Sequence, residues 1–153
     1  MSMGACYVAI QKDTLDELLA SPQASLSDFV FDDANAPFIT RYSLEQAWDA
    51  FRCLFEDDLP DLSGDELLQG VDLGECCFLI YPDQVARLAK GLAEFTLEEL
   101  KTKFDSEEFQ TADFYWENAW KEDFTEIAEM FNGLVAFFAG AAQRDEAMLF
   151  YIG

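Results

Sequence analysis

The apolar positions of this chain follow two different periods. Three short runs are rich in β-branched and aromatic residues, which is typical of strands: 5–10, 76–81 and 147–152. The second and third runs are apolar at nearly every position, as in strands that are covered on both faces of a sheet. We therefore predict three strands, the latter two of them central.

Longer segments between these runs place apolar residues at helical spacing. They predict helices over 15–20, 44–55, 65–69, 82–95, 97–104 and 121–142. The last carries a broad apolar stripe that includes Phe124, Phe131 and Phe138, so we expect it to be the central core helix. Segments 21–36 and 56–63 have the composition of loops.

Capping boxes predict where several of these helices begin. In a capping box, a Ser or Thr and a Glu or Gln three residues later satisfy backbone N–H groups at the helix start. Four such pairs occur: Thr14 with Glu17, Ser43 with Gln46, Ser63 with Glu66, and Thr96 with Glu99. The glutamates of these pairs are therefore assigned a structural role.

Length and element order together predict the fold class. Helices that separate the strands indicate an α+β (α/β-like) fold, with a mixed β-sheet and helices packed against it. A chain of 153 residues is the length of one ordinary domain. We predict a single compact domain over 1–153.

The net charge of the chain limits the kinds of molecule that it can bind. The chain has 31 Asp and Glu against nine Lys and Arg, a formal net charge of -22. Such a surface repels phosphate backbones and anionic lipids and attracts basic proteins. We predict no direct nucleic-acid binding and no membrane partner. No signal-peptide pattern or membrane-length apolar stretch is evident, and the four cysteines form no disulfide framework, so we expect a cytoplasmic protein.

The sequence contains no recognisable set of catalytic residues. The absence of histidine excludes the usual Ser-His-Asp, Cys-His and His-ligated metal sites. A reactive Cys76 or Cys77 is disfavoured by Glu75 and the apolar residues beside it. Asp61, Ser63, Asp65 and Asp72 match some positions of a calcium-binding EF-hand loop, but Glu66 stands where that loop needs Gly. We predict no enzyme, no cofactor and no specific metal site.

The chain resembles a known family along nearly its whole length. The similarity lies in residues 1–7, Trp48-Asp49, residues 81–85, the stretch 97–104 followed by Phe114-Tyr115-Trp116, and residues 147–152. Their order resembles that of the YfbM-like family of small bacterial proteins, a domain of unknown function. The resemblance implies a compact domain with α and β elements, and no set of catalytic residues.

The arrangement of charge suggests a function. Every charged residue between Arg52 and Arg87 is acidic, and we expect this segment to contact a partner. The predicted partner-binding residues are Asp57, Asp58, Asp61, Asp65, Asp72, Glu75, Tyr115, Trp116 and Trp120. A merely solvated acidic face and a core role for the aromatic residues remain alternatives.

These observations favour a non-enzymatic acidic binding protein that neutralises a basic protein. Its most concrete form is an immunity protein that blocks a bacterial toxin or effector. Two alternatives stay open. One is a hydrolase that uses carboxylates, with or without Mg²⁺ or Ca²⁺, and the other is a housekeeping or stress protein whose charge serves only solubility.

Overall fold

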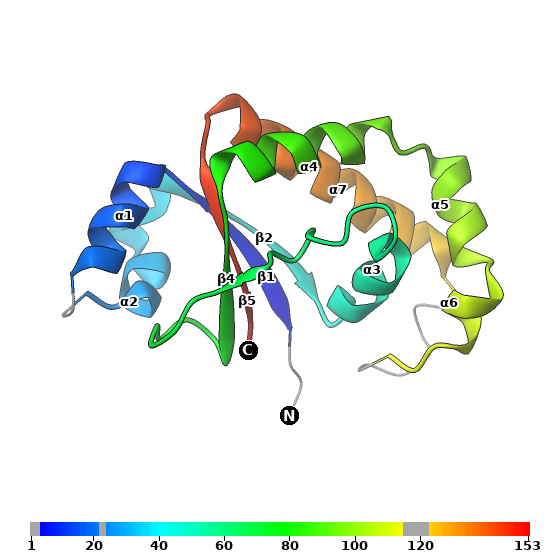
Figure 1. Ribbon diagram of the computed structural model, residues 1–153, viewed down its shortest axis with the longest axis horizontal. Coiled ribbons are helices and arrows are strands. Elements are labelled where there is room, and N and C mark those ends of the chain that lie inside the picture. Colours follow the sequence, from blue (N-terminus) through cyan, green and yellow to red (C-terminus); the bar gives the residue numbers. More distant parts are fainter. Residues whose placement is uncertain (1–3, 22–23, 115–122) are drawn as a thin grey trace.

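Five strands form one antiparallel sheet at the centre of the protein (Figure 1). The computed structural model describes residues 4–21, 24–114 and 123–153. The strands are β1 (Ala5–Ile10), β2 (Ile39–Glu45), β3 (Glu66–Leu67), β4 (Cys76–Ile80) and β5 (Ala147–Ile152). Their order across the sheet is β2-β1-β5-β4-β3. The three predicted strands are thus confirmed, and β5 lies in the middle of the sheet.

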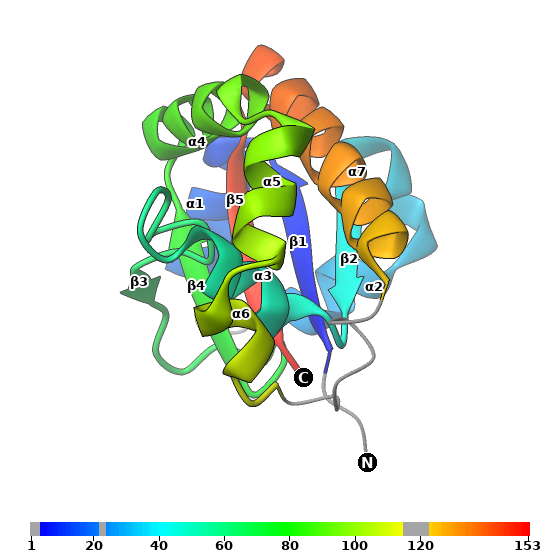
Figure 2. The same cartoon turned by 90° about the vertical axis from the view of Figure 1, so that its right-hand side faces the viewer.

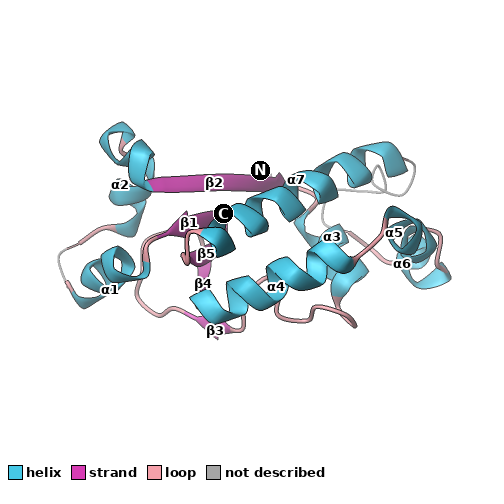
Figure 3. Cartoon of the chain, turned by 90° about the horizontal axis from the view of Figure 1, so that it is seen from above, coloured by secondary structure: helices cyan, strands magenta, loops and turns pink. Residues whose placement is uncertain are grey.

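Helices cover both faces of this sheet. They are α1 (Lys12–Ala20), α2 (Leu26–Phe31), the 3-10 helix η1 (Asp33–Phe38), α3 (Trp48–Phe55), α4 (Pro82–Glu94), α5 (Leu97–Phe104), α6 (Glu107–Thr111) and α7 (Phe124–Gln143). Seen from above the sheet, α4 and α7 run side by side, and α1 and α2 lie apart from them (Figure 3). Within the described residues, no helix is both long and apolar enough to cross a membrane.

The pleat of the central strands separates two hydrophobic cores. Tyr7 and Phe150 belong to the larger core, which also holds the buried faces of α3, α4, α5 and α7. Val8 and Leu149, one position away in each strand, belong to the smaller core under α1 and α2. Successive side chains of a strand point to opposite faces, so an apolar residue at every position requires cover on both sides. In β4, Ile80 likewise belongs to the larger core and Cys77 and Leu79 belong to the smaller one, so the predicted burial of β4 and β5 on both faces is confirmed.

The α+β class and the packing of helices on a sheet are confirmed, whereas the strand directions differ from the prediction. All four strand pairs are antiparallel, so the sheet is not mixed. The reason is visible in Figure 1: α4 leaves the end of β4, and α7 returns the chain to that same end before β5 begins. A strand that starts where its neighbour stops must run antiparallel to it.

Helix positions were predicted better at the C-terminal end than near the middle of the chain. The predicted helix 97–104 matches α5, and α4 and α7 agree within a few residues of the predictions. The predicted helix 65–69 is wrong, because Glu66 and Leu67 pair with β4. The predicted loop 21–36 contains α2 and part of η1, and the helix predicted from residue 44 begins only at Trp48.

Three of the four capping boxes do not cap a helix. Thr96 and Glu99 form the predicted box at the start of α5. Thr14 lies inside α1, however, Ser43 lies in β2, and Ser63 precedes β3. The same four-residue pattern is compatible with a turn or a strand, because the Ser and Thr hydroxyls can bond to nearby backbone in those conformations as well.

Candidate functional site

An acidic loop connects α3 to β3 and holds four of the predicted partner-binding residues. The loop comprises residues 56–65 and includes Asp57, Asp58, Asp61 and Asp65. Its two leucines, Leu59 and Leu62, are buried in the larger core. The buried Tyr7 hydroxyl donates a hydrogen bond to the Leu62 carbonyl at 2.6 Å. These contacts fasten the loop to the domain and leave Asp57, Asp58 and Asp65 exposed.

Two glycines permit the close approach of this loop. A Cβ on Gly91 of α4 would lie 2.8 Å from Leu59 Cδ2, so the Leu59 side chain packs against α4 at a position that has no side chain of its own. Gly64 has a φ of +83°, and a Cβ there would lie 2.8 Å from the Cβ of Phe78. Positive φ is easily adopted only by glycine. The course of the acidic loop therefore depends on both residues.

The first part of the loop adds its charge to that of α6, at the end of the molecule seen in Figure 2. Carboxylate oxygens of Glu56, Asp57 and Glu108 lie within 4.8 Å of one another. A hydrogen bond between the Glu56 and Glu108 carboxyl groups, together with their repulsion, raises the pKa of Glu56. Asp58 forms an ion pair with Lys103 at 2.5 Å. Acidic residues of the loop and of α6 thus lie on one exposed surface. Among these described residues, Asp58 and Lys103 form the one ion pair.

The second part of the loop surrounds Arg87 of α4. Asp61 forms an ion pair with Arg87, which lowers the pKa of Asp61. Gln84 Nε2 lies 3.4 Å from both Asp61 Oδ2 and Asp65 Oδ1, so α4 ties the two acids together. Asp83 adds its charge to those of Asp61 and Asp65 around the same guanidinium. One cation therefore faces three carboxylates.

Other predicted partner-binding residues lie elsewhere. Asp72 accepts hydrogen bonds from the Ser25 hydroxyl and from the backbone N–H of Ser27 at the start of α2, on the side of the smaller core. Glu75 is exposed just before β4, and its N–H donates to the Ile152 carbonyl at 2.7 Å. The structure thus gathers Asp57, Asp58, Asp61 and Asp65 on one loop and places Asp72 and Glu75 apart from them.

The predicted aromatic anchors Tyr115, Trp116 and Trp120 lie outside the described residues. Phe114, just before them, is half-buried and packs on Phe109 with ring centroids 4.9 Å apart. Sequence reasoning did not single out Glu108, Gln84 or Arg87. Only the tertiary contacts of α4 and α6 with the loop bring these side chains to the surface in question.

The acids that matched an EF-hand do not converge on one point. Asp61 is paired with Arg87 and Asp72 bonds with Ser25, while the short strand β3 separates the two. The carboxylate oxygens of Glu56, Asp57 and Glu108 do approach one another, but all three side chains are exposed. Exposed carboxylates are well hydrated, so this group by itself does not define a metal site.

No disulfide joins the four cysteines, and two of them lie in surroundings that disfavour the thiolate. Cys77 is buried in the smaller core, and its burial raises its pKa to about 12. Burial also raises the pKa of Cys6. A thiol needs an electropositive setting to become a thiolate at neutral pH. Burial therefore opposes thiolate formation at Cys6 and Cys77.

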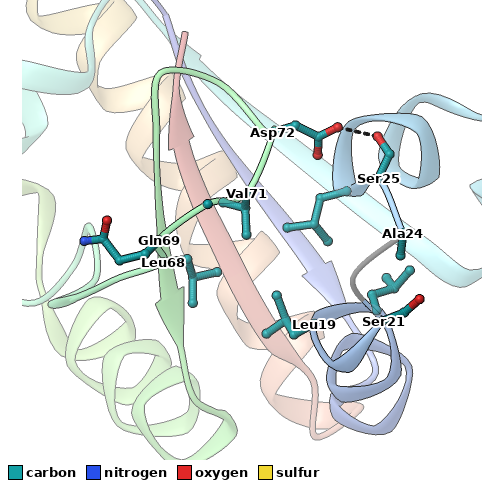
Figure 4. A pocket seen from close by; sticks show the side chains of 11 residues that line it. Leu19, Ser21, Ala24, Ser25, Leu68, Gln69, Val71 and Asp72 are labelled. Atoms are coloured by element: carbon teal, nitrogen blue, oxygen red, sulfur yellow. Dashed lines mark hydrogen bonds between the residues drawn. The ribbon is translucent and has the colours of Figure 1, made fainter.

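A cleft on the other side of the molecule was not predicted from the sequence. It lies between α1, α2 and the segment that joins β3 to β4, and has a volume of about 570 Å³ (Figure 4). Its apolar walls are formed by Leu18, Leu19, Leu26, Leu68 and Val71. Asp72 and Ser25 close one end. Because α2 was predicted as loop, no sequence signal brought these residues together.

Comparison with known protein families places the chain. A family model described as "Domain of unknown function (DUF1877)" matches residues 1–151. The chain belongs to the DUF1877 family. A solved structure titled as a protein of unknown function, YfbM from Escherichia coli, is similar with a TM-score of 0.70 and 16% sequence identity, over 98% of this chain and 99% of that one. A comparison with curated proteins finds no match.

Membership in DUF1877 confirms the resemblance that the sequence motifs suggested. At 16% identity, the similarity to YfbM shows a shared fold and nothing about activity. A function for this DUF1877 protein must therefore be argued from its own surface.

Proposed function

We propose that this DUF1877 protein is a non-enzymatic binding protein that neutralises a basic protein, most concretely an immunity protein that blocks a bacterial toxin or effector. The observation that carries this proposal is the acidic loop, whose buried leucines hold a row of carboxylates at the surface. The lack of a disulfide among the four cysteines of the chain supports a role in the reducing cytoplasm.

The loop suits recognition of cations because much of its charge is not neutralised within the chain. Arg87 and Lys103 each form an ion pair with one loop carboxylate. Among the described residues, Glu56, Asp57 and Asp65 form no ion pair. The pKa of Glu56 is raised first by its hydrogen bond with Glu108 and then by repulsion from the same carboxylate. A basic partner would relieve this repulsion, which makes its binding favourable.

Attachment of the loop to the core supports fast and specific binding. A fastened loop loses little conformational entropy when a partner orders it. Complementary charge can raise association rate constants to about 10⁹ M⁻¹s⁻¹ at low salt. The proposed mechanism is occlusion: the loop covers a cationic groove in which a toxin holds its own anionic substrate.

A carboxylate-based hydrolase would need acids that converge in a deep pocket. The carboxyl groups with shifted pKa have different partners, since Glu56 bonds with Glu108, Asp61 with Arg87 and Asp72 with Ser25. No specific observation on the described residues favours the hydrolase, so it is not proposed further.

The test is a comparison of two variants with equal charge. The partner is captured from extracts of the source organism, purified, and mixed with each variant while association rates are measured over a range of salt. Asp57→Asn/Asp65→Asn removes two loop carboxylates, and Asp13→Asn/Glu17→Gln removes two exposed carboxylates from α1. We expect the loop variant to associate about tenfold more slowly and the control to change less than twofold.

Two outcomes would contradict the proposal. Equal slowing in both variants would mean that only net charge matters, which would leave solubility as the role of the acids. An association rate that does not depend on salt would exclude electrostatic steering. Inhibition of the partner's activity by the wild-type protein, relieved in the loop variant, would distinguish a toxin from an ordinary basic partner.

A further inference from the structure

The cleft under α1 and α2 has the shape of a small-molecule site. Its volume of about 570 Å³ lies within the range of about 300–1,000 Å³ that is usual for ligand sites. Leu18 and Leu19 of α1 face Leu68 and Val71 across it, and Leu26 of α2 completes the apolar wall. Figure 4 shows the Gln69 amide turned away from this space. The apolar part of a small ligand would be buried between these two walls.

Asp72 provides a fixed negative charge at one end of the cleft. Its Oδ2 accepts from the Ser25 hydroxyl and its Oδ1 accepts from the Ser27 N–H, 3.2 Å away. These hydrogen bonds lower the pKa of Asp72, so the carboxylate is ionised at neutral pH. No ion pair to Asp72 forms within the described residues.

The backbone beside Asp72 leaves the cleft accessible. Gly70 has a φ of +72°, and a Cβ built there would meet no atom within 4 Å. Leu19 is 37% exposed on the opposite side. Apolar surface and a carboxylate are therefore reachable from solvent through the same opening.

We propose that this cleft binds a small amphipathic amine, with its apolar body between Leu19 and Val71 and its protonated amino group on the Asp72 carboxylate. An ammonium group carries three donors and would give the Asp72 carboxylate the ion pair that it lacks within the described residues. An anionic ligand would be repelled both by Asp72 and by the net charge of -22. This site is separate from the acidic loop, and neither proposal depends on the other.

The probes are hexylamine and 2-phenylethylamine, with hexanol and hexanoate as matched compounds that lack the positive charge. Binding to the ¹⁵N-labelled protein is followed by amide chemical shifts at about 0.3 M salt, where the general attraction of cations to an acidic surface is screened. We expect saturable shifts confined to α1, α2 and residues 68–72 for at least one amine. Hexanol and hexanoate should bind at least tenfold more weakly.

Three variants assign the contacts. Asp72→Asn keeps the size of the side chain and removes its charge, and should weaken amine binding at least tenfold. Leu19→Trp should weaken both amines by filling the cleft from its exposed edge. Glu98→Gln removes one exposed charge from α5, at the other end of the molecule, and should leave the affinity within twofold of wild type.

Each contrary result would overturn the proposal. If neither amine gives saturable shifts, the cleft is not an amine site. If Asp72→Asn and Glu98→Gln weaken binding equally, the amines bind to the acidic surface in general. If hexanol binds as tightly as hexylamine, the carboxylate does not take part. Amide spectra of the free variants establish that each one is folded.

Discussion

The two faces of the sheet differ in how they are packed and in what they expose. The larger core is aromatic: the Phe55 ring lies 5.1 Å from that of Phe95 and 5.7 Å from that of Phe131. The smaller core is built mainly from aliphatic residues, among them Leu15, Leu26 and Val30, under two short helices. The acidic loop is fastened to the first core and the cleft opens beside the second. The aromatic core thus holds the leucines of the acidic loop, whereas the two short helices leave a cleft beside the aliphatic core.

Truncation of one core residue on each face should have the largest effect and should test this contrast. Phe55→Ala removes a buried ring from the aromatic core and should lower the free energy of unfolding by about 3–5 kcal/mol. Leu26→Ala should cost about 2–3 kcal/mol, because its site borders the cleft and can relax or hydrate. Chemical denaturation measures both. A greater loss for Leu26→Ala would show that the smaller core is the better packed one.

Loss of the Tyr7 hydroxyl tests whether the acidic loop is fixed from below. Tyr7→Phe leaves the Leu62 carbonyl without this donor in a buried setting and should cost about 1–3 kcal/mol. The matched control is Tyr42→Phe, since Tyr42 is half-buried and donates to the Met130 carbonyl at 2.8 Å. We expect faster hydrogen exchange of the loop amides in Tyr7→Phe alone. Unchanged exchange rates would show that the hydrogen bond from Tyr7 to Leu62 does not hold the loop in place.

Two threonines with the same sequence signal should respond differently to substitution. Thr96→Ala removes the side chain that accepts from the Glu99 N–H at the start of α5 and should cost about 1 kcal/mol. Thr14→Ala, inside α1, should change stability by less than about 0.5 kcal/mol, because alanine has the higher helix propensity. Thermal denaturation of both variants provides the measurement. An equal loss at Thr14 would mean that α1 begins later than the structure places it.

Acidification should have the smallest effect, and its sign should reverse. The pKa of Glu56 is raised above its ordinary value of 4.5, so its protonation as the pH falls below neutrality favours the folded state. The pKa values of Asp61 and Asp72 are lowered below 3.8, so their contribution persists above that pH and is lost as the pH falls through their folded values.

The melting temperature should therefore rise between pH 7 and about pH 5 and fall below about pH 3.8. Glu56→Gln should reduce the rise, and added salt should reduce it as well, because screening weakens the repulsion between carboxylates. A melting temperature that falls steadily from neutral pH at low salt would contradict this account.

Local sequence patterns predicted correctly those helices and strands whose conformation does not depend on pairing with a distant part of the chain. The apolar runs at 76–81 and 147–152 could be buried only in a sheet that is covered on both faces, and the box at Thr96 matches its helix. Glu66 and Leu67 were predicted as helix, but their pairing with β4 determined their conformation. The second strand was not predicted either, since its pattern of buried and exposed residues is irregular and follows its place at the sheet edge.

Of the two candidate surfaces, the acidic loop was visible in the sequence and the cleft was not. Sequence alone identified Asp57, Asp58, Asp61 and Asp65, because a run without basic residues is visible in the chain itself. It also placed Asp72 and Glu75 with them, although a turn of the chain carries both to other parts of the molecule. The amine cleft needs α2 to pack opposite residues 68–72, and that contact joins segments more than forty residues apart.

The sequence by itself determined that this chain folds, that the runs at 76–81 and 147–152 are covered on both faces, and that its surface is strongly acidic. Hydrophobic period and net charge depend on the residues alone. Only the tertiary structure decided that the sheet is antiparallel, which acids share a surface and where a cleft remains. Those features depend on the direction in which α7 returns the chain and on side chains that meet across long sequence separations, and no local pattern encodes either.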